Sequence, residues 1–251
     1  MVRVIINGCS GHMGKVVTDV IAEDPDIETV AGIDIADNHD RDYPVFTDPK
    51  TCGVEADAII DFSNFRAVDG ILDFAKERKI PLVLCTTGLT EEQLAKVEEY
   101  SQDVAILRSA NMSLGINLLL KLVREATVVL KDSGFDIEIL EEHHNRKIDA
   151  PSGTALALAD SINEASGGRY HYVYGRQDRH EKRDAKEIGI SSIRGGTIVG
   201  IHDVIYAGTD EVVEIRHTAY SRAIFAKGAV AAAKFLAGKK AGKYDMADVI
   251  G

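Results

Sequence analysis

Short apolar runs alternate with amphipathic stretches through the first part of the chain. Runs typical of buried strands occupy residues 2–7, 29–33, 57–62, 81–86 and 104–107. Apolar positions recur at helical spacing in residues 12–23 and 66–78, and Thr90 with Gln93 has the spacing of a capping box that begins a third helix. Strands that alternate with helices in this way predict a mostly parallel sheet with helices on both faces.

The pattern changes beyond about residue 110. The expected elements there are helices at 114–130, 152–165 and 223–236 and a strand at 136–141. Three strand-like runs lie between residues 187 and 217, and the short glycine turns between them favour an antiparallel or mixed sheet. The polar stretch 167–186 is expected to be an exposed loop.

These two patterns predict an α/β chain of two domains. The first domain is expected to span residues 1–110 and to be completed by residues 222–251. The second is expected to be an α+β domain of residues 111–221.

Composition narrows the class of protein. Of the 251 residues 45% are hydrophobic and 27% charged, as in ordinary globular proteins. The net charge of −11 argues against nucleic acid as a partner. No apolar run is long enough for a membrane span or a signal peptide, so we expect a cytoplasmic protein. Cys9, Cys52 and Cys85 show neither a disulfide framework nor the spacing of a zinc site.

A glycine-rich turn follows the first strand. Gly8, Gly11 and Gly14 open a helix, where free N–H groups and the helix dipole favour a pyrophosphate, and Asp34 closes the second strand, where an acid suits ribose hydroxyls. Ile35 follows this acid in place of a cation, so NADH is expected to be favoured, with NADPH as the second candidate because Arg41 lies nearby. The simpler alternative is a tight strand-to-helix turn without a ligand.

Small polar residues follow two of the later strands. Thr86-Thr87-Gly88 and Ser109-Ala110-Asn111-Met112 come at the carboxyl edge of the expected sheet, where doubly wound folds bind ligands. They suit a nicotinamide pocket, and they equally suit turns and helix caps.

The segment from Glu141 to Thr154 carries the densest set of chemical groups. His143 suits proton transfer, Lys147 supplies a cation and a second proton donor, and Gly153 and Thr154 begin a helix whose free N–H groups suit a carboxylate. Surface residues and a plain helix cap are the structural alternatives. No metal is expected, because adjacent histidines on extended chain point to opposite sides and the His-Glu-x-x-His pattern is missing.

This segment closely resembles the signature of the dihydrodipicolinate reductase family. Residues 138–155 carry the longest match. The other matching motifs are the loop 8–14, Asp61-Phe62-Ser63, Thr86-Thr87-Gly88, the stretch 110–115 and Ile193-Arg194-Gly195-Gly196. The resemblance implies a Rossmann-type parallel-sheet domain for the cofactor, an α+β domain with a mixed sheet for substrate binding and tetramerisation, and a homotetramer. It also implies reduction, by NAD(P)H, of a cyclic dicarboxylate in lysine biosynthesis.

The resemblance further implies a role for each matching residue. His143 matches the family's proton donor and acceptor and Lys147 its second proton donor, while Arg222 is similar to a substrate arginine. The residues that match substrate carboxylate contacts are His144, Gly153 and Thr154. The residues that match cofactor contacts are Gly8, Cys9, Ser10, Gly11, His12, Met13, Asp34, Cys85, Thr86, Thr87, Ser109, Ala110, Asn111 and Met112.

Two positions depart from the family's pattern. Ile35 stands where members often have arginine, and Cys85 stands where they often have glycine. Cys9 and Cys85 lead to the hypothesis that two thiols flank the dinucleotide, so that alkylation inactivates the protein and NADH protects it. Another nicotinamide-dependent dehydrogenase and a non-enzymatic NADH sensor are the alternative functions, which an activity panel separates.

Overall fold

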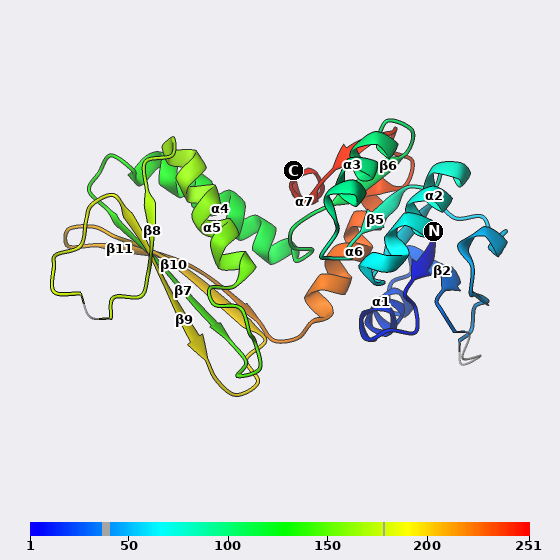
Figure 1. The fold of residues 1–251 in the computed structure, drawn as a ribbon, viewed down its shortest axis with the longest axis horizontal. Helices are drawn as coiled ribbons and strands as arrows, with labels where there is room; N and C mark the ends of the chain where they lie inside the picture. Colours follow the sequence, from blue (N-terminus) through cyan, green and yellow to red (C-terminus); the bar gives the residue numbers. More distant parts are fainter. Residues whose placement is uncertain (37–40, 178) are drawn as a thin grey trace. The chain divides into compact units, whose positions relative to one another are not determined.

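The computed structural model describes residues 1–36, 41–177 and 179–251 and divides them into two compact units (Figure 1). Unit 1 comprises Met1–Leu114 and Ala223–Gly251, and unit 2 comprises Gly115–Arg222. No helix in the described ranges has the length and apolar character needed to cross a bilayer.

Unit 1 is built on a parallel sheet of seven strands. The strands are β1 (Val2–Asn7), β2 (Ile27–Ile33), β3 (Val45–Phe46), β4 (Ala58–Asp61), β5 (Leu82–Leu84), β6 (Ala105–Arg108) and β12 (Gly242–Tyr244). Their order is β12-β6-β5-β4-β1-β2-β3, and every neighbouring pair is parallel. The direction of strand succession reverses between β1 and β4, and open α/β sheets bind ligands at the carboxyl ends of the strands at such a point.

Helices cover both faces of this sheet. They are α1 (His12–Ala22), α2 (Val68–Arg78), α3 (Glu91–Tyr100), α6 (Ala223–Leu236) and α7 (Met246–Ile250), with short 3₁₀ turns η1 (Pro49–Thr51) and η2 (Phe65–Ala67). One apolar cluster joins α1 and α6 to one face, and another joins α2 to the opposite face. Both faces of the sheet are therefore buried, which explains why the sequences of its strands are continuous apolar runs.

Unit 2 is a mixed sheet with two helices on one face (Figure 1). Its strands are β7 (Asp136–His143), β8 (His171–Tyr174), β9 (Glu187–Arg194), β10 (Gly200–Ala207) and β11 (Val212–Ala219), and its helices are α4 (Leu114–Leu130) and α5 (Gly153–Ser166). The order is β11-β10-β7-β9-β8, with β10 antiparallel to both neighbours and the other pairs parallel. The expectation of an antiparallel or mixed sheet is confirmed, and the sheet is mixed.

The central strand β7 alternates strictly between its two faces. Ile137 and Ile139 point into the apolar core beneath the helices, and Glu141 and His143 continue the same face at the end of the strand. Side chains of a strand alternate sides, so the core face changes there from apolar to ionisable. This change marks the site of unit 2.

The prediction of an exposed loop over residues 167–186 is wrong in part. Residues His171–Tyr174 form β8, which pairs with β9 at the edge of the sheet, and Val173 is buried. The strand has four residues and mostly polar or aromatic composition, so its pattern alone is weak. The short strands β3 and β12 are not predicted from the sequence either, because each is defined by its pairing with a neighbouring strand.

Candidate functional site

The glycine turn of unit 1 brings the ends of β1 and β4 into close contact with α1. Gly8 has φ +81°, and a Cβ on it would lie 2.6 Å from the carbonyl oxygen of Phe62. A Cβ on Gly14 would lie 2.2 Å from the carbonyl oxygen of Gly8, so α1 packs directly on the turn. Both glycines are therefore required by geometry, and the first N–H groups of α1 open toward the carboxyl edge of the sheet.

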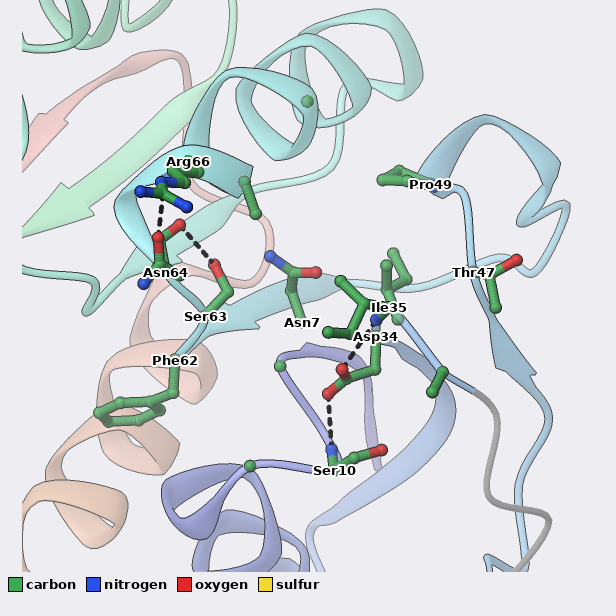
Figure 2. A pocket seen from close by; sticks show the side chains of 16 residues that line it. Asn7, Ser10, Asp34, Ile35, Thr47, Pro49, Phe62, Ser63, Asn64 and Arg66 are labelled. Atoms are coloured by element: carbon green, nitrogen blue, oxygen red, sulfur yellow. Dashed lines mark hydrogen bonds between the residues drawn. The ribbon is translucent and has the colours of Figure 1, made fainter.

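Asp34 is fixed beside this turn by two backbone amides (Figure 2). The N–H of Ser10 donates to Oδ2 at 2.8 Å, and the N–H of Ile35 donates to Oδ1 at 2.7 Å. The carboxylate is thus held at the rim of a cavity with lone pairs left to accept further hydrogen bonds. This arrangement suits a ribose diol.

Two adjoining cavities follow the carboxyl edge of the sheet. The first, of about 660 Å³, is lined by predicted residues Gly8, Ser10, Gly11 and Asp34, together with Arg66, which Figure 2 shows beside Asn64. The second, of about 400 Å³, is lined by eight further predicted residues, namely Met13, Cys85, Thr86, Thr87, Ser109, Ala110, Asn111 and Met112. Phe62 and Ser63 line both cavities. An elongated ligand with a bulky group at each end, such as a dinucleotide, therefore fits the two cavities together.

Sequence reasoning left the lining residues Asn7, Phe62, Ser63, Arg66 and Phe225 out of the cofactor set. In the sequence, the run Asp61-Phe62-Ser63 stands out only as a motif that matches the family. Its position directly after a buried strand, next to the reversal of strand order, was the available signal for Phe62 and Ser63.

A buried carboxylate braces the floor where the two cavities meet. Asp61 accepts hydrogen bonds from Asn7 Nδ2 at 2.6 Å, from Thr86 Oγ1 at 2.6 Å and from the Ser63 N–H at 3.3 Å. Burial raises the pKa of Asp61 despite these donors. Because Asn7 ends β1, Asp61 itself ends β4 and Thr86 follows β5, this acid joins the ends of three strands.

Cys9 and His12 line neither cavity. Cys9 is fully buried beneath β2, where a Cβ on Gly32 would lie 2.6 Å from its Sγ, and His12 is the exposed first residue of α1. Burial raises the pKa of the Cys9 thiol, and burial with the nearby Asp61 carboxylate raises that of Cys85 well above 9.0. The Cys9 thiol therefore does not flank the site, and Cys85 alone lines a cavity as a weakly ionised thiol.

In unit 2 the carboxylate of Glu141 is buried and bound by four groups. Arg194 donates from Nη2 to Oε1 at 2.7 Å and from Nη1 to Oε2 at 2.8 Å. His143 Nδ1 lies 2.6 Å from Oε2, and the N–H of Ser152 donates to Oε1 at 3.1 Å. Burial alone would raise the pKa of Glu141, but hydrogen bonds from Arg194, Ser192 and His143 outweigh it and lower the pKa to about 2.

His202 on β10 joins this group from the other side. Its ring meets the His143 ring edge-on with centroids 5.2 Å apart, and its Nε2 lies 3.1 Å from Ser152 Oγ. Burial first, and then the neighbouring His143, lower the pKa of His202 to about 3. Ser152 Oγ also accepts the N–H of Ala155 and so caps α5, which links the histidines to the beginning of that helix.

The predicted residues of the loop gather beside this group. Lys147 Nζ donates to both carboxylate oxygens of Asp149 at 2.8 Å, and the Lys147 N–H donates to the carbonyl of His144. Partial desolvation, with the charges of Arg146 and Arg222 next, lowers the pKa of His144. Gly153 and Thr154 are the first two residues of α5, immediately after Ser152.

Unit 2 thus assembles five of its predicted residues around one strand end and one helix start, namely His143, His144, Lys147, Gly153 and Thr154. Arg194 and His202 were missing from the predicted site, although Arg194 lay in a noted motif. The available signal for His202 was a pair of polar residues, His202-Asp203, inside an apolar strand pattern.

Models of one protein family match both units of the chain. The family model described as "Dihydrodipicolinate reductase, N-terminus" matches residues 2–112, and that described as "Dihydrodipicolinate reductase, C-terminus" matches residues 115–250. A protein of Caldanaerobacter subterraneus subsp. tengcongensis, named 4-hydroxy-tetrahydrodipicolinate reductase, is 54% identical over 100% of this chain and 98% of its own. A protein of the same name from Clostridium tetani is 48% identical over 98% of this chain and 96% of its own.

A solved structure shares the fold. Dipicolinate-bound dihydrodipicolinate reductase from Paenisporosarcina sp. TG-14 superposes with a TM-score of 0.81 over 100% of both chains at 24% identity. The expected fold class, a Rossmann-type parallel-sheet domain with a second domain containing a mixed sheet, is confirmed.

Proposed function

Because the chain belongs to the dihydrodipicolinate reductase family, we propose that it reduces 4-hydroxy-2,3,4,5-tetrahydrodipicolinate to tetrahydrodipicolinate with NAD(P)H in diaminopimelate and lysine biosynthesis. The observation that carries this function in the structure is the group at the end of β7. There an imidazole braced by a buried carboxylate lies next to a lysine and a capped helix start.

The proposed roles within unit 2 follow from charge. His143 exchanges a proton with the substrate, and Lys147 supplies a second proton. His144 and the N–H groups of Gly153 and Thr154 bind the two carboxylates, since helix starts attract anions. The Lys147 ammonium already pairs with Asp149, so this pair must loosen when Lys147 serves the substrate.

Unit 1 is proposed to bind the dinucleotide. When bound, NAD(P)H supplies the hydride, and water leaves the substrate ring. Asp34 accepts hydrogen bonds from ribose hydroxyls, the first turn of α1 neutralises the pyrophosphate, and the residues of the second cavity hold the nicotinamide. The proposed cofactor contacts exclude the side chains of Cys9 and His12.

We propose NADH as the favoured cofactor. An anionic Asp34 at the cavity rim repels a 2′-phosphate, and Ile35 beside it offers no charge to compensate. Arg41 is the cation that makes NADPH the second candidate. Its Nη2 donates to the carbonyl oxygen of Cys9 at 3.2 Å, so the guanidinium contacts the glycine turn.

The proposed assembly is a homotetramer in the cytoplasm. Its support is the sheet face of unit 2 opposite α4 and α5, where Leu140, Ile193, Ile201, Ile205 and Val212 lie among charged side chains. An exposed sheet face of this kind suits contact with another copy. Light scattering coupled to gel filtration measures the oligomer directly.

A coupled assay tests the function. The substrate is generated in place from pyruvate and aspartate semialdehyde, and oxidation of NADH or NADPH is followed by absorbance. We expect turnover with both and a lower KM for NADH. Absence of turnover would reject the function, and a lower KM for NADPH would reject the cofactor preference alone.

A further inference from the structure

The register of three strands places four ionisable side chains on one face of the unit 2 sheet. His143 pairs with Arg194 across β7 and β9, and Glu141 pairs with His202 across β7 and β10. Paired residues of neighbouring strands point to the same face, so all four continue the surface that carries the apolar core. Their contacts are therefore set by backbone pairing.

The buried Glu141 carboxylate is the hub of this group. Arg194 contacts both oxygens in the bidentate geometry that arginine forms with carboxylates, and the guanidinium also donates to the carbonyl of Asp149 at 2.6 Å. The remaining contacts of Glu141 reach His143 Nδ1 and the Ser152 N–H. One carboxylate thus joins the proposed proton donor, the loop of Lys147 and the beginning of α5.

We propose that Glu141, Arg194 and His202 are positioning residues for His143, which hold its ring with the proton on Nδ1 and leave Nε2 as the atom that exchanges a proton with the substrate. This inference rests on the proposed function. It adds three residues to the two proton donors, and none of the three touches the substrate.

The tautomer follows from hydrogen bonding. An ionised carboxylate only accepts, so His143 Nδ1 must carry the proton that lies between it and Glu141. The other ring nitrogen lies over Gly200, where a Cβ would stand 3.1 Å from Nε2. Glycine at this position keeps side-chain atoms away from the reacting nitrogen.

His202 keeps the neighbouring ring position uncharged. With its pKa lowered to about 3, His202 is neutral near neutral pH and places no second imidazolium beside the His143 ring. Through its contact with Ser152 it also fixes the distance between the His143 ring and the helix start proposed to bind a carboxylate.

Several charged groups face or approach the His143 ring. They are Glu141 on the same strand, Arg194 on β9, His202 on β10, His217 on β11, which pairs with His202, and His144, Lys147 and Asp149 in the following loop. Among the described residues, Glu141 alone bonds the ring through a carboxylate. Removing its charge is therefore the perturbation with the clearest expected sign.

The first test needs no variant. In the full-length protein labelled with ¹⁵N at histidine, imidazole nitrogen shifts report which ring nitrogen carries the proton. We expect His143 to be protonated at Nδ1 in its neutral form and His202 to remain neutral down to mildly acidic pH. A neutral His143 with its proton on Nε2 would overturn the inference.

The second test is Glu141→Gln with Glu142→Gln as its matched control. Glu142 is the next residue of β7 on the opposite face, where it pairs with Arg216 at 3.5 Å. The glutamine amide at position 141 offers an N–H to His143 Nδ1 and so favours the wrong tautomer. We expect kcat to fall about 10-fold to 100-fold, which is part of the roughly 10²–10⁴-fold effect of proton transfer itself.

The pH profile separates positioning from loss of structure. Glu141→Gln removes the carboxylate that lies 2.6 Å from His143 Nδ1, so the pH at which kcat falls to half should move to lower values. In His202→Phe, loss of the contact with Ser152 should raise the substrate KM by about threefold to tenfold, and the altered edge contact with the His143 ring should lower kcat as well. An unshifted profile in a folded Glu141→Gln, or equal losses in Glu142→Gln, would overturn the inference.

Different experimental results would reject the proposed function and the positioning inference. Absence of turnover in the unaltered protein rejects the function, while the nitrogen shifts of His143 still decide its tautomer. Full turnover together with an Nε2-protonated His143 rejects the positioning inference and leaves the function intact.

Discussion

The ionisation of Glu141 should stabilise the folded protein in a way that depends on pH. Burial raises the pKa of Glu141, but hydrogen bonds from Arg194, Ser192 and His143 outweigh it and leave the pKa at about 2 in the folded state, against 4.5 for an unperturbed glutamate. At about 1.4 kcal/mol for each tenfold change in proton affinity, this difference is worth about 3 kcal/mol at neutral pH. Glu141→Gln removes this contribution and also leaves Arg194 without its carboxylate.

The sign of the pH dependence follows from the lowered pKa. The contribution is complete above about pH 5, and it is lost as pH falls toward 2, because the unfolded chain takes up the proton first. At pH 3.5 it should be about 2 kcal/mol. The gap in unfolding free energy between the native protein and Glu141→Gln should therefore narrow by about 1 to 2 kcal/mol between pH 7 and pH 3.5.

Urea unfolding followed by circular dichroism measures this gap. All proteins are compared at one concentration, so that any assembly contributes equally, and Glu142→Gln serves as the control because its carboxylate lies on the other face. A gap that stays constant with pH, or the same narrowing in the control, would refute the assignment of the stabilisation to the ionised Glu141.

The remaining predictions concern chemistry and packing. His143→Gln should lower kcat by roughly 10²–10⁴-fold with a smaller change in KM, and Lys147→Ala should worsen both parameters by about 10-fold to 100-fold, as steady-state kinetics will report. Gly228→Ala would place a Cβ 1.6 Å from the carbonyl oxygen of Met112, so urea unfolding should show a loss of about 1–3 kcal/mol or more and NADH should bind more weakly. Alkylation by iodoacetamide at neutral pH should be slow at Cys85, and rapid inactivation prevented by NADH would contradict the raised thiol pKa.

Much of unit 1 could be predicted because its signals are local. The capping box of Thr90 and Gln93 begins α3 as expected, since both hydrogen bonds join residues three apart. The turn from Gly8 to Gly14 likewise depends on contacts between near neighbours, and from it the sequence predicts a ligand at this edge of the sheet. Its contact with Phe62 joins residues distant in sequence, and Phe62 was left out of the predicted cofactor set.

Edge strands mark a limit of pattern reading. The four residues of β8 hold their place through pairing with β9, and the two residues of β3 through pairing with β2. Such short segments bury too little apolar surface to leave a periodic signal. Their structure is imposed by partners that the local sequence does not contain.

Dependence on distant partner strands also explains which residues of the proposed proton-transfer group could not be predicted from the sequence. His143 and Lys147 lie four residues apart and were visible as one cluster, whereas Arg194 and His202 reach Glu141 and His143 only after β9 and β10 pair with β7. From the sequence alone, Glu141 is only an orienting or structural neighbour of the histidines. With the strands paired, Glu141 is held ionised, since the Arg194 guanidinium donates to both of its oxygens and the Ser152 N–H donates to one of them. The chemistry proposed for a short loop thus depends on a charge that long-range strand pairing holds in place.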